Sequence, residues 1–143
     1  HALSYGQKKR VAIAGVLAME PQVVILDEPT AGLDPQGVGE IMRLIAELRD
    51  GLGITFLIAT HDMDIVPLYC DRAYLLSGGR VTGEGTVEEL LTQPELLREN
   101  HLRLPRIAHL MEILRDVDGL DADRSAATIS AARREIKRIL GTE

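Results

Sequence analysis

Residues 23–29 read Val-Val-Ile-Leu-Asp-Glu-Pro, an apolar run that ends abruptly at two carboxylates and a proline. Four consecutive apolar residues, three of them β-branched, predict a buried strand of a parallel sheet. Ligands of open α/β sheets bind beyond the carboxyl ends of the strands, so Asp27 and Glu28 are expected where a metal ion or a phosphate would lie. An isolated Asp-Glu pair can also simply end a strand and face water, so the neighbouring motifs are needed to choose between this interpretation and a binding site.

The segment before this strand predicts a helix. Residues 3–7 read Leu-Ser-Tyr-Gly-Gln and precede an apolar-rich segment that Pro21 closes. Ser4 is a good N-cap residue, and the exposed amides of a helix N-terminus attract anions. Ser4 is therefore either a cap alone or a cap at an anion-binding helix end.

A second helix and a second strand are predicted after Pro29. Asp34 is expected to cap the helix, with Pro35 in its first turn, and apolar residues then recur with helical spacing from Ile41. Gly51 and Gly53 are expected to end it. The buried strand 54–59 follows and stops at Thr-His-Asp.

His61 follows that second strand directly. A single histidine at a strand end is often a hydrogen-bonded structural residue. Because parallel strands end at the same edge of a sheet, His61 should however emerge beside Asp27 and Glu28. This shared position favours a functional role.

The next segment alternates short helices and strands. Asp62 is expected to cap a short helix that runs to about Tyr69, and a Gly-Gly turn joins two strands within residues 72–85. A capping box at residues 86–89 opens another helix, and Pro94 begins the next one.

After residue 100 the sequence predicts a helical appendage. Apolar residues recur at helical spacing from Leu104 to Leu114, residues 116–123 form an acidic hinge, and a last helix is expected from Ser125 to Leu140. The apolar faces either pack within the protein or, if exposed, mark an interface with a partner.

Composition limits the classes of function. The 143 residues are 45% hydrophobic and 27% charged with a net charge of -6, which argues against general affinity for nucleic acid or anionic lipid. The single cysteine, Cys70, suits a reducing compartment. The apolar runs fall well short of the ~20 residues that span a bilayer, so we expect no transmembrane segment.

Four motifs, in this order and spacing, resemble the ATP-binding cassette (ABC) family over residues 1 to about 85. They are Leu-Ser-Tyr-Gly-Gln at residues 3–7, the strand 23–29, Ala-Gly-Leu-Asp at 31–34 and Ala-Thr-His at 59–61. In that family they are the signature, the Walker B strand, the D-loop and the switch histidine. The resemblance implies an α/β fold with a mainly parallel sheet, the C-terminal half of a P-loop, RecA-like nucleotide-binding domain.

The resemblance also implies roles for single residues, with ATP and Mg²⁺ as cofactors. Asp27 would hold Mg²⁺, Glu28 would orient or deprotonate the attacking water, and His61 would contact the γ-phosphate. Asp34 matches the D-loop aspartate at the seam between two ATPase subunits.

The signature residues would reach ATP held by the opposite subunit. Ser4, Gly6 and Gln7 match the family's pattern, whereas Tyr5 replaces its commoner glycine. This departure concerns how closely the backbone approaches the nucleotide at this point.

The family's phosphate-cradling loop, a glycine-rich turn ending in Gly-Lys-Ser/Thr, does not occur in the 143 residues. The chain also begins at His1-Ala2 directly before a motif. We therefore expect the C-terminal half of a longer subunit, inactive by itself, with domain residues 1–85 and a helical C-terminal extension at 86–143.

Residues 90–107 look like the extension on the ATPases of energy-coupling-factor importers for cobalt, nickel and vitamins. This resemblance implies a second ATPase subunit in a homo- or heterodimer, membrane-embedded transport subunits as partners, and a place at the cytoplasmic face of the membrane. Two alternatives stay open: a soluble ABC-type ATPase acting as a mechanical switch in translation or DNA repair, and a non-enzymatic dimerisation fragment.

Overall fold

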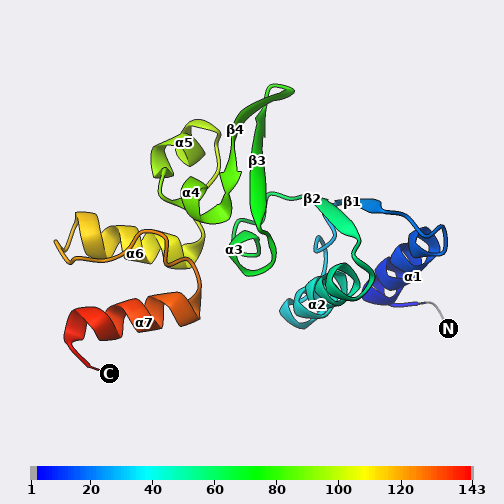
Figure 1. Cartoon of the computed structure of the whole chain (residues 1–143), viewed down its shortest axis with the longest axis horizontal. Helices are drawn as coiled ribbons and strands as arrows, with labels where there is room; N and C mark the ends of the chain where they lie inside the picture. The colour runs from blue at the N-terminus through cyan, green and yellow to red at the C-terminus, as the bar shows by residue number, and fades with distance from the viewer. Residues whose placement is uncertain (1–2, 143) are drawn as a thin grey trace. The chain divides into compact units, whose positions relative to one another are not determined.

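The structure is a computed structural model that describes residues 3–142. The expectation drawn from His1 and Ala2 lies outside the described residues. The chain forms two compact units, His1–His61 and Asp62–Glu143, whose elements are labelled in Figure 1. The domain boundary expected at residue 85 stays a prediction.

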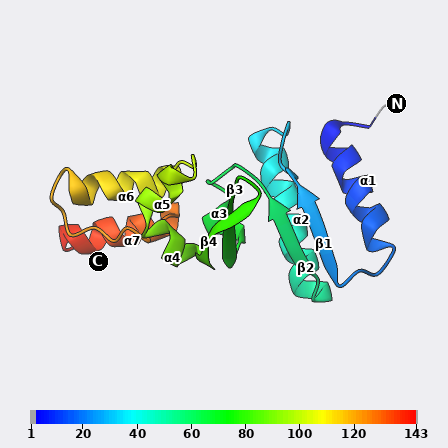
Figure 2. The same cartoon turned by 90° about the horizontal axis from the view of Figure 1, so that it is seen from above.

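The first unit consists of two helices and two strands. In chain order they are α1 (Tyr5–Leu17), β1 (Val23–Asp27), α2 (Pro35–Leu52) and β2 (Thr55–Ala59). The strands pair in parallel, in a register that runs from Val23 opposite Thr55 to Asp27 opposite Ala59 (Figure 2). The predicted parallel pairing is confirmed, and the register brings the two strand ends to the same edge.

The expectation that β1 and β2 are buried strands is wrong for most of their residues. Val24 is 2% exposed, whereas Val23 and Ile25 are 52% and 74% exposed, and Leu57 of β2 is 48% exposed. Side chains alternate between the two faces of a strand, and the burial of both strands alternates accordingly, so residues 3–61 cover one face of this sheet more than the other. The apolar run therefore predicts a strand, but it does not predict whether one face of the strand is covered or both.

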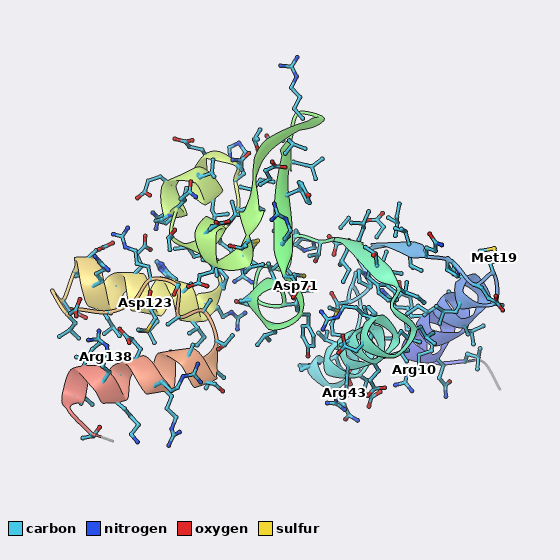
Figure 3. The ribbon with its side chains drawn as sticks, viewed as in Figure 1. Arg10, Met19, Arg43, Asp71, Asp123 and Arg138 are labelled. Atoms are coloured by element: carbon cyan, nitrogen blue, oxygen red, sulfur yellow. The ribbon has the colours of Figure 1, made fainter. Side chains whose placement is uncertain are left out.

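Side-chain caps fix both helix starts of the first unit. Ser4 and Gln7 form a capping box at α1, and Asp34 accepts a hydrogen bond from the amide of Gly37 at α2, as the sequence predicts for both caps. Gly53, with φ of 66°, closes α2, whereas Gly51 lies inside the helix. Arg10 of α1, labelled in Figure 3, forms an ion pair with Glu40 of α2.

The second unit begins with α3 (Val66–Tyr69), β3 (Arg72–Ser77) and β4 (Arg80–Thr86). The strands form the predicted antiparallel hairpin, whose turn residues Gly78 and Gly79 have φ of 56° and 73°. Asp62 does not cap α3 as expected, because its carboxylate accepts a hydrogen bond from the amide of Asp64 before the helix begins.

Helices α4 (Val87–Leu91) and α5 (Pro94–Glu99) follow the hairpin, and both begin where the sequence predicts. The capping box of Thr86 and Glu89 starts α4. The hairpin and these helices share a core with neighbouring segments of the second unit, and this core consists of buried apolar residues: Met63, Val66, Leu75, Val87, Leu90, Leu91, Leu97, Leu104, Ala108 and Ala127.

The last two helices are α6 (Arg106–Asp116) and α7 (Ile129–Leu140). The expected start of the last helix at Ser125 is wrong: Thr128 is the N-cap, and Ser125 instead donates hydrogen bonds to the carboxylate of Asp123. Met111 of α6 is fully buried, in a small core with Ala132 of α7 and with Ala122 and Ala126 of the segment between the two helices. Arg138 of α7, labelled in Figure 3, forms an ion pair with Asp121. Among residues 3–142, no helix combines the length and the apolar character that crossing a membrane requires.

Candidate functional site

The carboxyl ends of β1 and β2 bring Glu28 and His61 together. Glu28 follows Asp27, which is opposite Ala59 in the sheet register, and the backbone amide of Glu28 donates to the carbonyl of Ala59 at 2.9 Å. His61 Nδ1 lies 2.6 Å from Glu28 Oε1, and the His61 backbone amide donates to the same oxygen at 3.1 Å. Thr60 Oγ1 donates to the other carboxylate oxygen at 3.4 Å.

Glu28 adopts an unusual backbone conformation. Its φ of 45° lies in the left-handed region that residues other than glycine rarely occupy. Such a conformation persists only where the surroundings hold it, and it is often found at functional sites. Here the conformation turns the chain sharply at the strand end and directs the carboxylate toward His61.

The hydrogen bonds also set the charge of Glu28. The side-chain hydrogen bond with His61 lowers the pKa of the Glu28 carboxyl below its usual value. The carboxylate is 33% exposed and the His61 side chain 84% exposed, so both remain accessible from solvent. An ionised carboxylate can orient a water molecule, and an exposed imidazole beside it can contact a phosphate.

Asp27 lies next to this pair, at the exposed end of β1. No group of three or more His, Cys, Asp or Glu side chains within residues 3–142 could hold a metal ion by itself. Mg²⁺ is usually held by one or two carboxylates together with phosphate oxygens and water. The carboxylate of Asp27 is a ligand of this type.

Ser4 and Gln7 are both engaged at the start of α1. The Ser4 amide donates to Gln7 Oε1 at 2.9 Å, and the Gln7 amide donates to Ser4 Oγ at 3.2 Å. Gly6 lies near Leu33, and a Cβ at Gly6 would be 3.7 Å from Leu33 Cδ2. The motif at residues 3–7 thus lies against the loop that follows β1.

Tyr5 and Asp34 have separate contacts around the same loop. The Tyr5 ring packs on Gly32, where a Cβ would lie 3.1 Å from the ring. Asp34 Oδ1 accepts from the Gly37 amide at 2.7 Å and is occupied with capping α2. Neither residue contacts Glu28 or His61 through a hydrogen bond that the structure records.

Lys9 is a residue of this site that sequence reasoning missed. Its ammonium donates to the carbonyl oxygens of Glu28 and Pro29, at 2.9 and 2.6 Å, and lies 5.4 Å from the centre of the Tyr5 ring. The available signal was its position four residues after Tyr5, on the same face of α1. The carbonyl partners could not be read from the sequence, because they depend on how α1 packs against the loop.

Comparison with known proteins places the chain in a family. A model described as "AAA domain, putative AbiEii toxin, Type IV TA system" matches residues 1–66. The energy-coupling factor transporter ATP-binding protein EcfA2 of Clostridium perfringens is 60% identical over 136 residues, which are 95% of this chain and 48% of the relative. The chain spans about half the length of the curated relatives that it matches.

Solved structures agree with this similarity. The structure of cbiO1 from Clostridium perfringens, described as part of the ABC transporter complex cbiONQ, is 64% identical with a TM-score of 0.62, over 79% of this chain and 45% of that one. A dimeric ATP-binding cassette in a post-hydrolysis state bound to ADP and Pi is 36% identical with a TM-score of 0.53, over 59% of this chain and 36% of that one. The fold is that of the C-terminal half of an ABC nucleotide-binding domain. With relatives of the energy-coupling-factor type over almost its whole length, the chain belongs to the ATP-binding cassette family.

Proposed function

We propose that this chain is part of an ATPase subunit that hydrolyses ATP with Mg²⁺ and thereby energises an importer. The observation that carries the proposal is the carboxylate of Glu28, 2.6 Å from His61 Nδ1 at the edge of a parallel sheet, where the hydrogen bond with His61 lowers the pKa of the carboxyl. Phosphoryl transfer consists mainly of positioning and charge neutralisation, and these two side chains can contribute to both.

Each residue at this edge has a distinct proposed role. Glu28 accepts a hydrogen bond from the attacking water, and His61 donates to the γ-phosphate. Asp27 would hold Mg²⁺, which would neutralise charge on the phosphates. The exposure of the Glu28 and His61 side chains supports these roles, because both groups must reach substrate rather than the core of the unit.

The signature residues act at a second subunit in this proposal. Ser4, Tyr5, Gly6 and Gln7 lie at the start of α1, and the amides of a helix N-terminus attract anions. They would contact ATP held by the opposite ATPase subunit, with Asp34 at the seam between the subunits. The similarity to a dimeric cassette structure supports a homo- or heterodimer.

The relatives suggest the setting of this activity. One is an energy-coupling factor transporter protein, and a solved relative is part of an ABC transporter complex. We therefore propose membrane-embedded transport subunits as partners, a position at the cytoplasmic face of the membrane, and cobalt, nickel or a vitamin as the cargo. The net charge of -6 favours these partners over nucleic acid.

Replacing Glu28 by glutamine tests the proposed chemistry. In a full-length subunit containing this chain, Glu28→Gln should lower ATP turnover to near background, because the amide cannot act as a base, while binding of MgATP persists. Steady-state hydrolysis and calorimetry measure the two quantities. Glu47→Gln, on an exposed face of α2, is the matched control and should behave like the wild type. Normal turnover in Glu28→Gln would remove Glu28 from catalysis.

A further inference from the structure

The ammonium group of Lys9 connects α1 to the backbone of the proposed catalytic residue. It donates to the carbonyl of Glu28 at 2.9 Å and to that of Pro29 at 2.6 Å, and it is partly buried. These two carbonyls belong to the peptide planes on either side of Pro29, and the first of these planes follows Glu28 directly. Lys9 therefore acts on the main chain at Glu28, and it leaves the carboxylate free to contact His61.

The main chain at Glu28 is held from three directions. The Glu28 carbonyl accepts from Lys9 and from the amide of Ala31, and the Glu28 amide donates to Ala59 of β2. Its left-handed φ of 45° requires such support, because a residue with a side chain does not favour that conformation. Lys9 is the only one of these three partners that belongs to α1.

Tyr5 places the Lys9 ammonium. The Tyr5 ring lies one helical turn before Lys9, with the ammonium 5.4 Å from the ring centre, an arrangement that favours a cation. The same ring packs on Gly32, whose φ of 74° and missing side chain allow the close approach. The tyrosine that replaces the family's commoner glycine thus contacts both the lysine and the loop that the lysine holds.

We propose that Lys9 is a positioning residue for Glu28, and that it couples the signature end of α1 to the catalytic carboxylate of the same chain. The inference rests on the proposed function, in which residues 4–7 face ATP at the opposite subunit while Glu28 serves this subunit's own ATP. A shift of α1 when the opposite site fills is then transmitted by Lys9 to the backbone of Glu28. Lys9 would thereby connect the two ATP sites of the dimer.

Arg10 provides a matched control on the same helix. It also carries a cation and also ties α1 to the rest of the unit, but through an ion pair with Glu40 of α2. Its loss should loosen α1 without touching the Glu28 backbone. Comparing Lys9→Met with Arg10→Met therefore separates positioning of Glu28 from general support of the helix.

The experiment uses the full-length subunit and two measurements. Lys9→Met should lower kcat by about tenfold or more with little change in KM for ATP, since a misplaced catalytic group slows chemistry more than it weakens binding. Lys9→Arg, which keeps a donor, should recover part of kcat. Hydrogen exchange without nucleotide should rise in a peptide covering residues 28–34 in Lys9→Met, and should stay unchanged there in Arg10→Met.

Two results would overturn the inference. The first is a normal kcat in Lys9→Met in a protein whose Glu28→Gln variant is inactive. The second is an equal loss of activity in Lys9→Met and Arg10→Met with faster exchange throughout the first unit, which would make Lys9 a stabilising residue only. Full turnover in Glu28→Gln, by contrast, would overturn the proposed function itself.

Discussion

Glu28 combines three unusual properties: a left-handed backbone, a lowered pKa and partial exposure at a strand end. The sequence predicts its position, because a buried run followed by two carboxylates places acids at the edge of the sheet. The sequence also predicts the meeting with His61, since both strands end at that edge. The strained φ and the two carbonyl contacts of Lys9 could not be predicted, because they arise from the packing of α1 on the loop.

His61 is expected to matter for the rate of hydrolysis. In the full-length subunit, His61→Ala should slow turnover by about 100-fold or more, because loss of one preorganised donor to the developing charge typically costs ~3 kcal/mol. Steady-state ATPase assays measure the effect. His109→Ala, which removes an exposed histidine of α6, serves as the control and should retain activity. If both variants hydrolyse ATP equally well, His61 has only a structural role.

At the scale of the elements, local chemistry explains most of what the sequence predicts. Caps at Ser4, Asp34 and Thr86 and the paired glycines of the hairpin act within a few residues, so their patterns identify element ends without tertiary information. The start of α7 was missed because Ser125 and Thr128 are both good N-cap residues. The choice between them depends on Asp123, whose carboxylate accepts hydrogen bonds from the amide and the hydroxyl of Ser125.

Glu135 makes the packing of α7 on the hinge sensitive to pH. It accepts a hydrogen bond from the amide of Asp123 at 2.8 Å and forms an ion pair with Arg138. The hydrogen bond with Arg138 is the main reason why the pKa of the Glu135 carboxyl is lowered. A carboxyl whose pKa is lower in the folded state stabilises the fold at pH values above its unfolded-state pKa near 4.5. This contribution is lost as the pH falls through the folded-state pKa.

We therefore expect Glu135→Gln to lower the melting temperature of the chain at neutral pH, with a difference from the wild type that shrinks in acid. Differential scanning calorimetry across the acid range measures it. Glu99→Gln, at the exposed end of α5, should change little at either pH. A difference that stays constant from neutral to acid pH would show that the charge of Glu135 is not responsible.

At the scale of the whole molecule, the strands β1 and β2 present apolar surface that the described residues do not cover. Val23, Ile25 and Leu57 are each about half exposed or more, and each strand pairs on one side only within residues 3–142. The sequence predicts apolar strands correctly, but burial depends on which other elements lie over the sheet. Composition cannot supply that information, because an apolar run has the same appearance whether one face is covered or two.

An exposed apolar strand with an unpaired edge is a template for another chain. We expect the isolated 143-residue chain to self-associate through β1 and β2, with an apparent mass that rises with concentration in multi-angle light scattering. Ile25→Thr combined with Leu57→Thr should reduce the association while circular dichroism stays unchanged, because threonine keeps the β preference and removes apolar area. Leu110→Thr, at an exposed position of α6, should leave the association as it is. A wild-type chain that remains monomeric at every concentration would mean that this face and edge are protected, and the placement of the strands would then have to be revised.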